Sequence, residues 1–150
     1  MTEKLIFKIV LDSTWDKEFH ENPPKASVNL NLTEYYNDYV FEETIIEFEH
    51  NCDQDNSLII SLLEKGPGDV KIDPIDGIII DKLLNIKSIE IDRINITNLC
   101  RTQSYYHPTD DWYIKAHGSE PLQNHTDLGL NGEWHFEFTT PWYSFLLEII

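Results

Sequence analysis

Apolar and polar residues alternate along most of this chain, and a period of two residues is typical of β-strands with one buried face. Residues 5–11 and 28–32 show this alternation, and 86–91 places isoleucines on one face. In 133–138, three aromatic side chains share one face, and two glutamates and a histidine share the other. The pattern predicts a core between two sheets that contains Ile9, Leu30, Ile60, Ile89, Ile91, Trp134, Phe136 and Phe138.

Turn signals separate the short elements, the clearest being Asn22-Pro23-Pro24, Lys65-Gly66-Pro67-Gly68-Asp69 and Asp76-Gly77. Two apolar runs, 45–50 and 58–63, flank a polar segment and predict a β-hairpin. Residues 33–38 are predicted to form a connection. Asp92-Arg93 is predicted to turn into a strand over 94–99, and 101–127 to form a long structured excursion.

The period changes near the end of the chain. An apolar stripe at helical spacing follows Pro141 and consists of Trp142, Phe145, Leu146 and Ile149. Proline suits the first turn of a helix, and Thr140 or Thr139 is predicted to cap it. Because an apolar segment at the end of a soluble chain is normally docked, this helix is expected to close the core or an interface.

These elements predict an all-β fold, an antiparallel β-sandwich of jelly-roll type with a short C-terminal helix. A chain of 150 residues is long enough for its own core, and no repeat or linker divides it, so 1–150 is predicted to be a single domain. The apolar content of 41% and the aromatic content of 12% exclude a disordered protein.

Acidic residues outnumber basic ones by 27 to 11, which gives a formal net charge of −16. This charge repels phosphate backbones and anionic lipid, so nucleic acid and membranes are not expected as partners. It favours solubility, divalent cations or a basic partner. The segment 26–64 holds no lysine or arginine, and it is either a solvated face or a surface for a basic partner.

Signals for targeting and for disulfide formation are not visible. The N-terminal segment resembles a strand and has no long apolar region, so secretion by a signal peptide is not expected. No stretch approaches the roughly 18 uninterrupted apolar residues of a membrane helix. Cys52 and Cys100 are predicted to be buried or half-buried thiols and not a disulfide framework.

The densest group of aromatic and polar residues lies in the least periodic part of the chain. It predicts a recognition surface formed by Tyr105, Tyr106, His107, Asp110, Asp111, Trp112 and Tyr113. Sugar rings stack on exposed aromatic side chains, and carboxylates accept hydrogen bonds from hydroxyl groups. Protein interfaces use the same residue types as anchors. The alternative is a loop that its own aromatic side chains hold against the sandwich.

Aspartates gather in a turn-rich segment before the strand at 84–91. Asp73, Asp76 and Asp81 are the candidate ligands for Ca²⁺, which prefers carboxylate and carbonyl oxygens. The alternative is a solvated loop in which these aspartates cap turns. In 53–64, the oxygen-bearing residues Asp53, Asp55, Ser57 and Glu64 match the spacing of a helix-loop-helix calcium loop. However, Leu58 replaces the glycine that such a loop needs, so a plain turn is predicted there.

Catalytic motifs are missing from the sequence. There is no GxSxG, glycine-rich phosphate loop, CxxC or HExxH pattern, and the six histidines show no zinc-ligand spacing. Carboxylates are abundant, but nothing selects the pair that a glycosidase needs. We therefore expect no enzymatic activity.

Two blocks of the sequence carry a resemblance to known proteins. Residues 81–92, DKLLNIKSIEID, are similar to a D-K-x-L-N-I-K-x-I-x-I-D pattern. Residues 128–134 and 140–148 resemble the ending L-G-x-N-G-x-W … S/T-P-x-Y-x-W/F-L-L-E. Both blocks resemble small, uncharacterised β-sandwich proteins encoded by tailed phages of marine bacteria. The resemblance covers 81–150. It implies a virion or phage-accessory context, with a location in the virion or in the host cytoplasm during assembly.

The first block is also similar to a strand pair of calcium-dependent carbohydrate-binding modules with a jelly-roll fold. Those modules carry an acidic loop before an L-x-I-x-x-I-x-I-D/N-G strand, and here Asp73, Asp76 and Asp81 precede it. Arg93 stands where that pattern has glycine. This second resemblance implies glycan binding, with Ca²⁺ as the candidate cofactor.

The sequence therefore favours a non-enzymatic structural or accessory phage protein whose partners are other virion proteins or itself. The alternative is a glycan-binding module for surface attachment, assisted by Ca²⁺. In the first interpretation Tyr106 and Trp112 are buried against a neighbouring subunit. In the second they stand exposed at the rim of a shallow groove.

Overall fold

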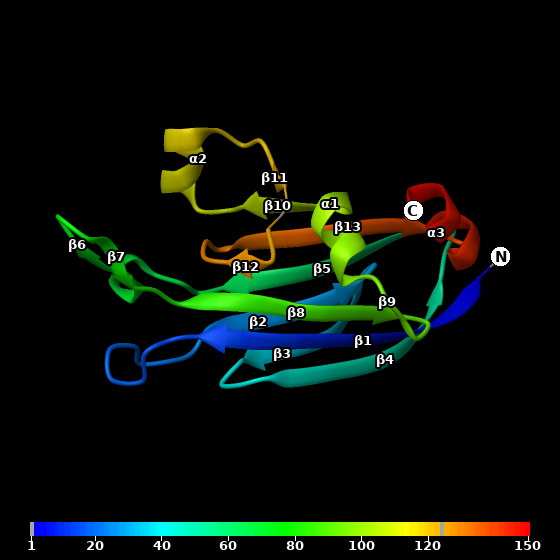
Figure 1. Ribbon diagram of the computed structural model, residues 1–150, viewed down its shortest axis with the longest axis horizontal. Coiled ribbons are helices and arrows are strands. Elements are labelled where there is room, and N and C mark those ends of the chain that lie inside the picture. The colour runs from blue at the N-terminus through cyan, green and yellow to red at the C-terminus, as the bar shows by residue number, and fades with distance from the viewer. Residues whose placement is uncertain (1, 124) are drawn as a thin grey trace.

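The computed structural model describes residues 2–123 and 125–150, which form two facing antiparallel sheets (Figure 1). The first sheet has the order β12-β8-β1-β4, with β9 paired to β8. Its strands are β1 (Glu3–Thr14), β4 (Thr44–Cys52), β8 (Leu83–Ile91), β9 (Ile94–Asn95) and β12 (Asp127–Leu128). The second sheet has the order β11-β10-β13-β5-β2-β3. Its strands are β2 (Lys25–Leu30), β3 (Thr33–Tyr39), β5 (Asp55–Leu63), β10 (Ser104–Pro108), β11 (Leu122–Gln123) and β13 (Gly132–Thr139).

Short helices and a separate ribbon complete the fold. The helices are η1 (Pro67–Asp69), α1 (Thr97–Gln103), α2 (Asp111–His117) and α3 (Trp142–Ile149). β6 (Lys71–Asp73) and β7 (Gly77–Ile80) form a two-stranded sheet of their own, the β6–β7 ribbon. Figure 1 shows this ribbon extending beyond the sandwich at the end where α2 lies, with α3 at the opposite end. The predicted fold class, an antiparallel β-sandwich of jelly-roll type with a C-terminal helix, is confirmed.

None of the helices among residues 2–123 and 125–150 combines the length and the apolar character that crossing a membrane requires. Both cysteines are buried free thiols, as predicted. Burial raises the pKa of Cys52 to about 12, and the negative charges of Glu3 and Asp53 add to the shift. Burial also raises the pKa of Cys100. Because the reactive form of cysteine is the thiolate, both side chains serve as small apolar core residues.

The core lies between the two sheets, where the alternating pattern places it. All eight residues predicted for the core are buried, and none of them is more than 2% exposed. Full burial of one such side chain stabilises the fold by about 1.5–3 kcal/mol relative to leaving it in water. The inward residues of β1 are Leu5, Phe7, Ile9 and Leu11, and those of β13 are Trp134, Phe136 and Phe138.

The hairpin predicted from 45–50 and 58–63 is wrong, although both runs are strands. β4 pairs with β1 in the first sheet, whereas β5 pairs with β13 and β2 in the second, so the chain crosses between the sheets after Cys52. Asn56 shapes this crossing. Its side-chain oxygen accepts a hydrogen bond from the Asp53 N–H, and its amide donates to the Asp53 carbonyl oxygen, each at 2.8 Å. Alternation predicts which face of a strand is buried, but not which sheet the strand joins.

Two further segments differ from their predicted form. Residues 33–38 lie within β3, an edge strand paired with β2, and an edge position tolerates their polar composition. The turn at Asp92 and Arg93 is present, with φ of 53° and 68°, but the strand that follows is only β9. The Asn95 side-chain oxygen then accepts a hydrogen bond from the Thr97 N–H at 3.0 Å, as at a helix start. Helix α1 therefore replaces the second half of the predicted strand.

Helix α3 covers one end of the sandwich, and its apolar stripe packs inward, as predicted (Figure 1). Trp142 is fully buried, and Leu146 is 5% exposed. Phe145 and Ile149 are partly buried and pack against the core.

The predicted threonine cap of α3 is wrong. Pro141 occupies the cap position, and a cis peptide bond joins it to Thr140. The Trp142 N–H, the first of the helix, instead donates a hydrogen bond to Glu3 Oε1 at 2.8 Å. A carboxylate from the first strand of the chain thus caps its last helix, a contact with no signal in the local sequence.

Candidate functional site

Trp112 is 61% exposed and lines a groove at the end of the sandwich that carries α2 and the β6–β7 ribbon. This Trp112 groove has a volume of about 510 Å³. Three charged side chains line it, namely Lys65, Asp81 and Asp110. Apolar side chains complete the lining, with Ile72 and Ile78 from the ribbon and Val70 and Leu130 from connecting segments. An apolar lining with a few polar groups is typical of sites for small ligands.

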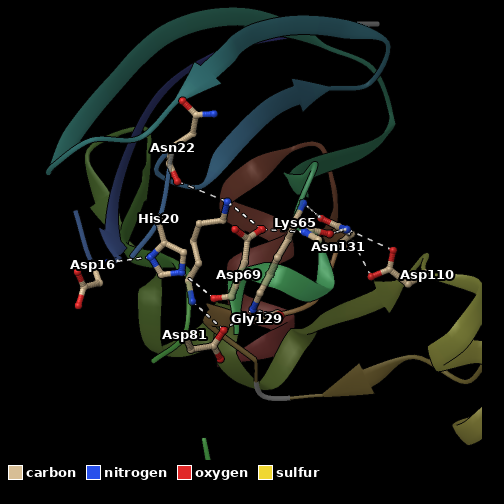
Figure 2. Close-up of polar contacts among 11 residues, drawn as sticks. Asp16, His20, Asn22, Lys65, Asp69, Asp81, Asp110, Gly129 and Asn131 are labelled. Carbon is tan, nitrogen blue, oxygen red and sulfur yellow. Dashed lines mark hydrogen bonds and ion pairs between the residues drawn. The ribbon is translucent and has the colours of Figure 1, made fainter. Parts of the chain in front are cut away.

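Asn131 holds two borders of the groove together, as Figure 2 shows. Its side-chain Nδ2 donates a hydrogen bond to the Lys65 carbonyl oxygen at 2.6 Å, and its Oδ1 accepts one from the Lys65 N–H at 2.8 Å. The same Nδ2 lies 3.2 and 3.4 Å from the two carboxylate oxygens of Asp110. Asn131 therefore ties the segment after β5 to the start of α2 and orients Asp110.

The Lys65 ammonium group forms part of the groove lining, although its side chain is only 7% exposed. It donates hydrogen bonds to the Asp81 carboxylate and to the Gly129 carbonyl oxygen (Figure 2). A charge with so little access to water needs such partners, because its desolvation is costly. Asp81 neutralises Lys65, and the pair joins three chain segments at the groove.

A second ion pair, Lys82 with Asp69, stabilises the adjoining loops (Figure 2). The Lys82 Nζ lies 3.1 Å from Asp69 Oδ2, which also accepts the Gly66 N–H at 2.8 Å. His20 Nε2 donates to the Asp69 carbonyl oxygen at 2.6 Å, and its Nδ1 accepts the Asp16 N–H at 2.9 Å. These two contacts fit a neutral imidazole with its proton on Nε2.

The pKa of Asp69 reports the strength of this pairing. Partial burial by itself would raise that pKa, but the Gly66 N–H and the Lys82 ammonium outweigh burial and hold the pKa below its usual value. A carboxyl group whose pKa is lowered by folding contributes stability that is complete above its unfolded pKa, near 3.9. The contribution is lost as the pH falls through the folded pKa.

We expect Asp69→Asn to lower the free energy of unfolding by about 1–3 kcal/mol at neutral pH, because Lys82 stays buried and loses its partner. The difference from the wild type should shrink as the pH falls below about 4, near the unfolded pKa, and should vanish only below the lower pKa of the folded carboxyl group. Urea unfolding of both proteins across this pH range measures it. Asp111→Asn, at an exposed carboxylate, is the control and should change stability by less than about 0.5 kcal/mol. A difference that does not vary with pH would contradict the role of Asp69.

The residues of the predicted recognition surface occupy several different places. Asp110 and Trp112 line the groove. Tyr105 and His107 lie on the outward face of β10, where Tyr105 is 41% exposed and the His107 ring meets that of His135 at a centroid distance of 4.9 Å. They therefore form a second patch on the sheet, separate from the groove lining.

Tyr106 does not belong to a surface, because it is 1% exposed and part of the core. It pairs with Trp134 across β10 and β13, so the two rings share the inward face of the sheet. The prediction that Tyr106 belongs to the recognition surface is therefore wrong.

Asp111 and Tyr113 lie on α2. Asp111 is exposed, and the half-buried Tyr113 ring lies 4.7 Å from that of His117.

The predicted calcium ligands do not come together. Asp73 Oδ1 accepts the N–H groups of Ile75 and Asp76 at 2.8 and 3.0 Å, and the Asp76 contact, followed by that of Ile75, lowers the pKa of Asp73. Asp81 is paired with Lys65. In the part of the chain that the structure describes, no three His, Cys, Asp or Glu side chains are grouped as metal ligands. These aspartates therefore do not fit a bound Ca²⁺ ion, and the alternative of turn-capping aspartates holds for Asp73.

The sequence pattern does not single out Lys65, Asn131 or the ribbon isoleucines as site residues. One residue of the block at 128–134, Gly132, does indicate how the site is built. A side chain at Gly132 would collide with the His107 carbonyl oxygen, so β10 and β13 approach closely there. This approach leaves Asn131 within reach of Asp110.

No protein-family model matches the sequence, and a search of curated proteins found no match. A similar solved structure is the selenomethionine form of vCBM60, which is described with the statement that circular permutation provides an evolutionary link between two families of calcium-dependent carbohydrate binding modules. The match covers 88% of this chain and 89% of that chain, with a TM-score of 0.53 and 10% sequence identity. At this identity the likeness shows the fold alone.

Proposed function

We propose that this protein is a non-enzymatic carbohydrate-binding module that holds a glycan in the Trp112 groove. The observation that carries the proposal is the exposed Trp112 ring beside the Asp81 and Asp110 carboxylates in one groove. The fold is similar to that of a carbohydrate-binding module, which supports the same class of function.

The groove offers the two kinds of contact that a sugar ring uses. Trp112 presents an apolar ring for the C–H face of a pyranose. Within the Asp81 carboxylate, Oδ1 accepts hydrogen bonds from the Lys65 ammonium group and the Lys82 N–H. The other oxygen, Oδ2, is left for a hydroxyl group of the ligand. Asp110 accepts hydrogen bonds in the same way. These contacts bind a sugar without breaking a bond in it.

We expect Trp112→Ala to weaken glycan binding at least tenfold, which corresponds to about 1.4 kcal/mol or more, because the stacking surface is lost. Isothermal titration calorimetry against a panel of oligosaccharides measures the change. Tyr143→Ala is a matched control, since Tyr143 is 56% exposed and lies on α3 at the other end of the sandwich. Equal weakening by both variants, or no binding of any oligosaccharide by the wild type, would rule the proposal out.

A second candidate is a virion structural or accessory protein that acts through protein–protein contact. The observation that favours it is the β6–β7 ribbon, on which Ile72, Ile75, Ile78 and Ile79 are 67, 91, 61 and 49% exposed. Exposed apolar patches of this kind mark protein interfaces. The partner would be another virion protein or a second copy of this chain. Self-association detected by light scattering, lost when the ribbon isoleucines are made polar, would favour this candidate over glycan binding.

A further inference from the structure

We infer that the Trp112 groove prefers glycans that carry a protonated amine, such as β-linked glucosamine oligosaccharides, over neutral or anionic ones. The inference rests on the proposed function and names the class of ligand for the same groove. It is carried by Asp110, whose carboxylate is the one charge in the groove lining without a counterion among residues 2–123 and 125–150.

The side chains that line the groove carry one positive and two negative charges, so one negative charge is not neutralised within the lining. Lys65 is neutralised by Asp81 and directs its other contact to the Gly129 carbonyl oxygen. The hydrogen bonds to the Asp110 carboxylate come from the neutral Asn131 amide, at the long distances of 3.2 and 3.4 Å. A neutral donor at such distances orients a carboxylate but does not compensate its charge.

An ammonium group on the ligand would meet three favourable features in this groove. A charge-assisted hydrogen bond to Asp110 is roughly twice as strong as one between neutral groups. A cation near the face of the Trp112 ring is attracted by its π electrons. The net charge of −16 also concentrates cations around the protein and repels anions. The same charges disfavour glycans that carry uronic acids or sulfate groups.

The test compares two hexasaccharides with the same β-linked backbone, one of glucosamine and one of N-acetylglucosamine, by calorimetry at a pH where the free amines are protonated. We expect the wild type to bind the glucosamine hexasaccharide about tenfold more tightly. Asp110→Asn preserves the shape of the side chain and should remove this preference. Asp111→Asn is the matched control, because it changes the net charge equally at an exposed neighbouring position.

The outcomes separate this inference from the proposed function. Equal affinity of the wild type for the two hexasaccharides would overturn the amine preference and leave glycan binding intact. Loss of the preference in Asp111→Asn as complete as in Asp110→Asn would assign it to net charge, and would also overturn the inference. If the wild type binds neither hexasaccharide and no neutral oligosaccharide, the proposed function itself fails.

Discussion

Replacing Trp134 by alanine is expected to lower the free energy of unfolding by about 3–5 kcal/mol, because the cavity left by the indole has no nearby exposed side chain to fill it. Trp134 is fully buried in the middle of the second sheet. Its cross-strand neighbours, Tyr106 on β10 and Ile60 on β5, are also buried, so the site is closed on both sides. Denaturant unfolding monitored by circular dichroism measures the loss.

Trp134→Phe is the matched control for this cavity. The Trp134 Nε1 has no hydrogen-bond partner in the part of the chain that the structure describes, so phenylalanine sacrifices no hydrogen bond. It also retains an aromatic ring near Phe136, whose centroid lies 6.4 Å from that of Trp134. We expect this variant to lose clearly less stability than Trp134→Ala. A loss below about 1 kcal/mol for Trp134→Ala would show that the residue lies outside the core.

Removal of residues 142–150 is expected to destabilise the protein by more than about 5 kcal/mol, because it strips Trp142 and Leu146 from the core and exposes what they cover. A loss of this size approaches the whole stability of a typical domain, about 5–15 kcal/mol. The shortened chain should therefore be largely unfolded. Loss of the β-sheet circular dichroism signal and a narrow dispersion of the amide proton chemical shifts would show this unfolding.

Two adjacent leucines test the same packing without the risk of complete unfolding. Leu146 is 5% exposed and Leu147 is 78% exposed, although both lie on α3. Leu146→Ala should cost about 2–5 kcal/mol, and Leu147→Ala less than about 0.5 kcal/mol. Equal losses at the two positions would mean that α3 is not docked as described.

The fold class and the inward face of each strand could be predicted, because burial in a sandwich imposes a period of two on the sequence. The partners of the strands could not. The runs at 45–50 and 58–63 alternate in the same way whether they pair with each other or join different sheets. The segment 94–99 is rich in β-branched residues, yet its second half lies in α1, which packs against β8, β11 and β13. Tertiary contacts overrode local propensity there.

The candidate site was partly predictable, because an exposed aromatic side chain beside carboxylates has a recognisable composition. Trp112 and Asp110 meet that expectation. Tyr106 has the same composition around it but faces inward, since its register against Trp134 decides its direction. Asp81 was selected as a metal ligand, and its pairing with Lys65 depends on a contact across sixteen positions of the sequence. Such contacts leave no local pattern.

The β6–β7 ribbon has ends that lie opposite each other, because Lys71 and Ile80 are paired. The chain therefore leaves and re-enters the rest of the fold across about one strand spacing, roughly 5 Å. A longer or shorter ribbon could replace this one without disturbing the core, while Trp112 and Asp110 would stay in place on α2 and the segment before it. The ribbon is therefore a separable insertion, and its length sets how far one wall of the groove extends. Among related proteins that bind ligands of different size, we expect the first differences to be changes of length between positions 70 and 81.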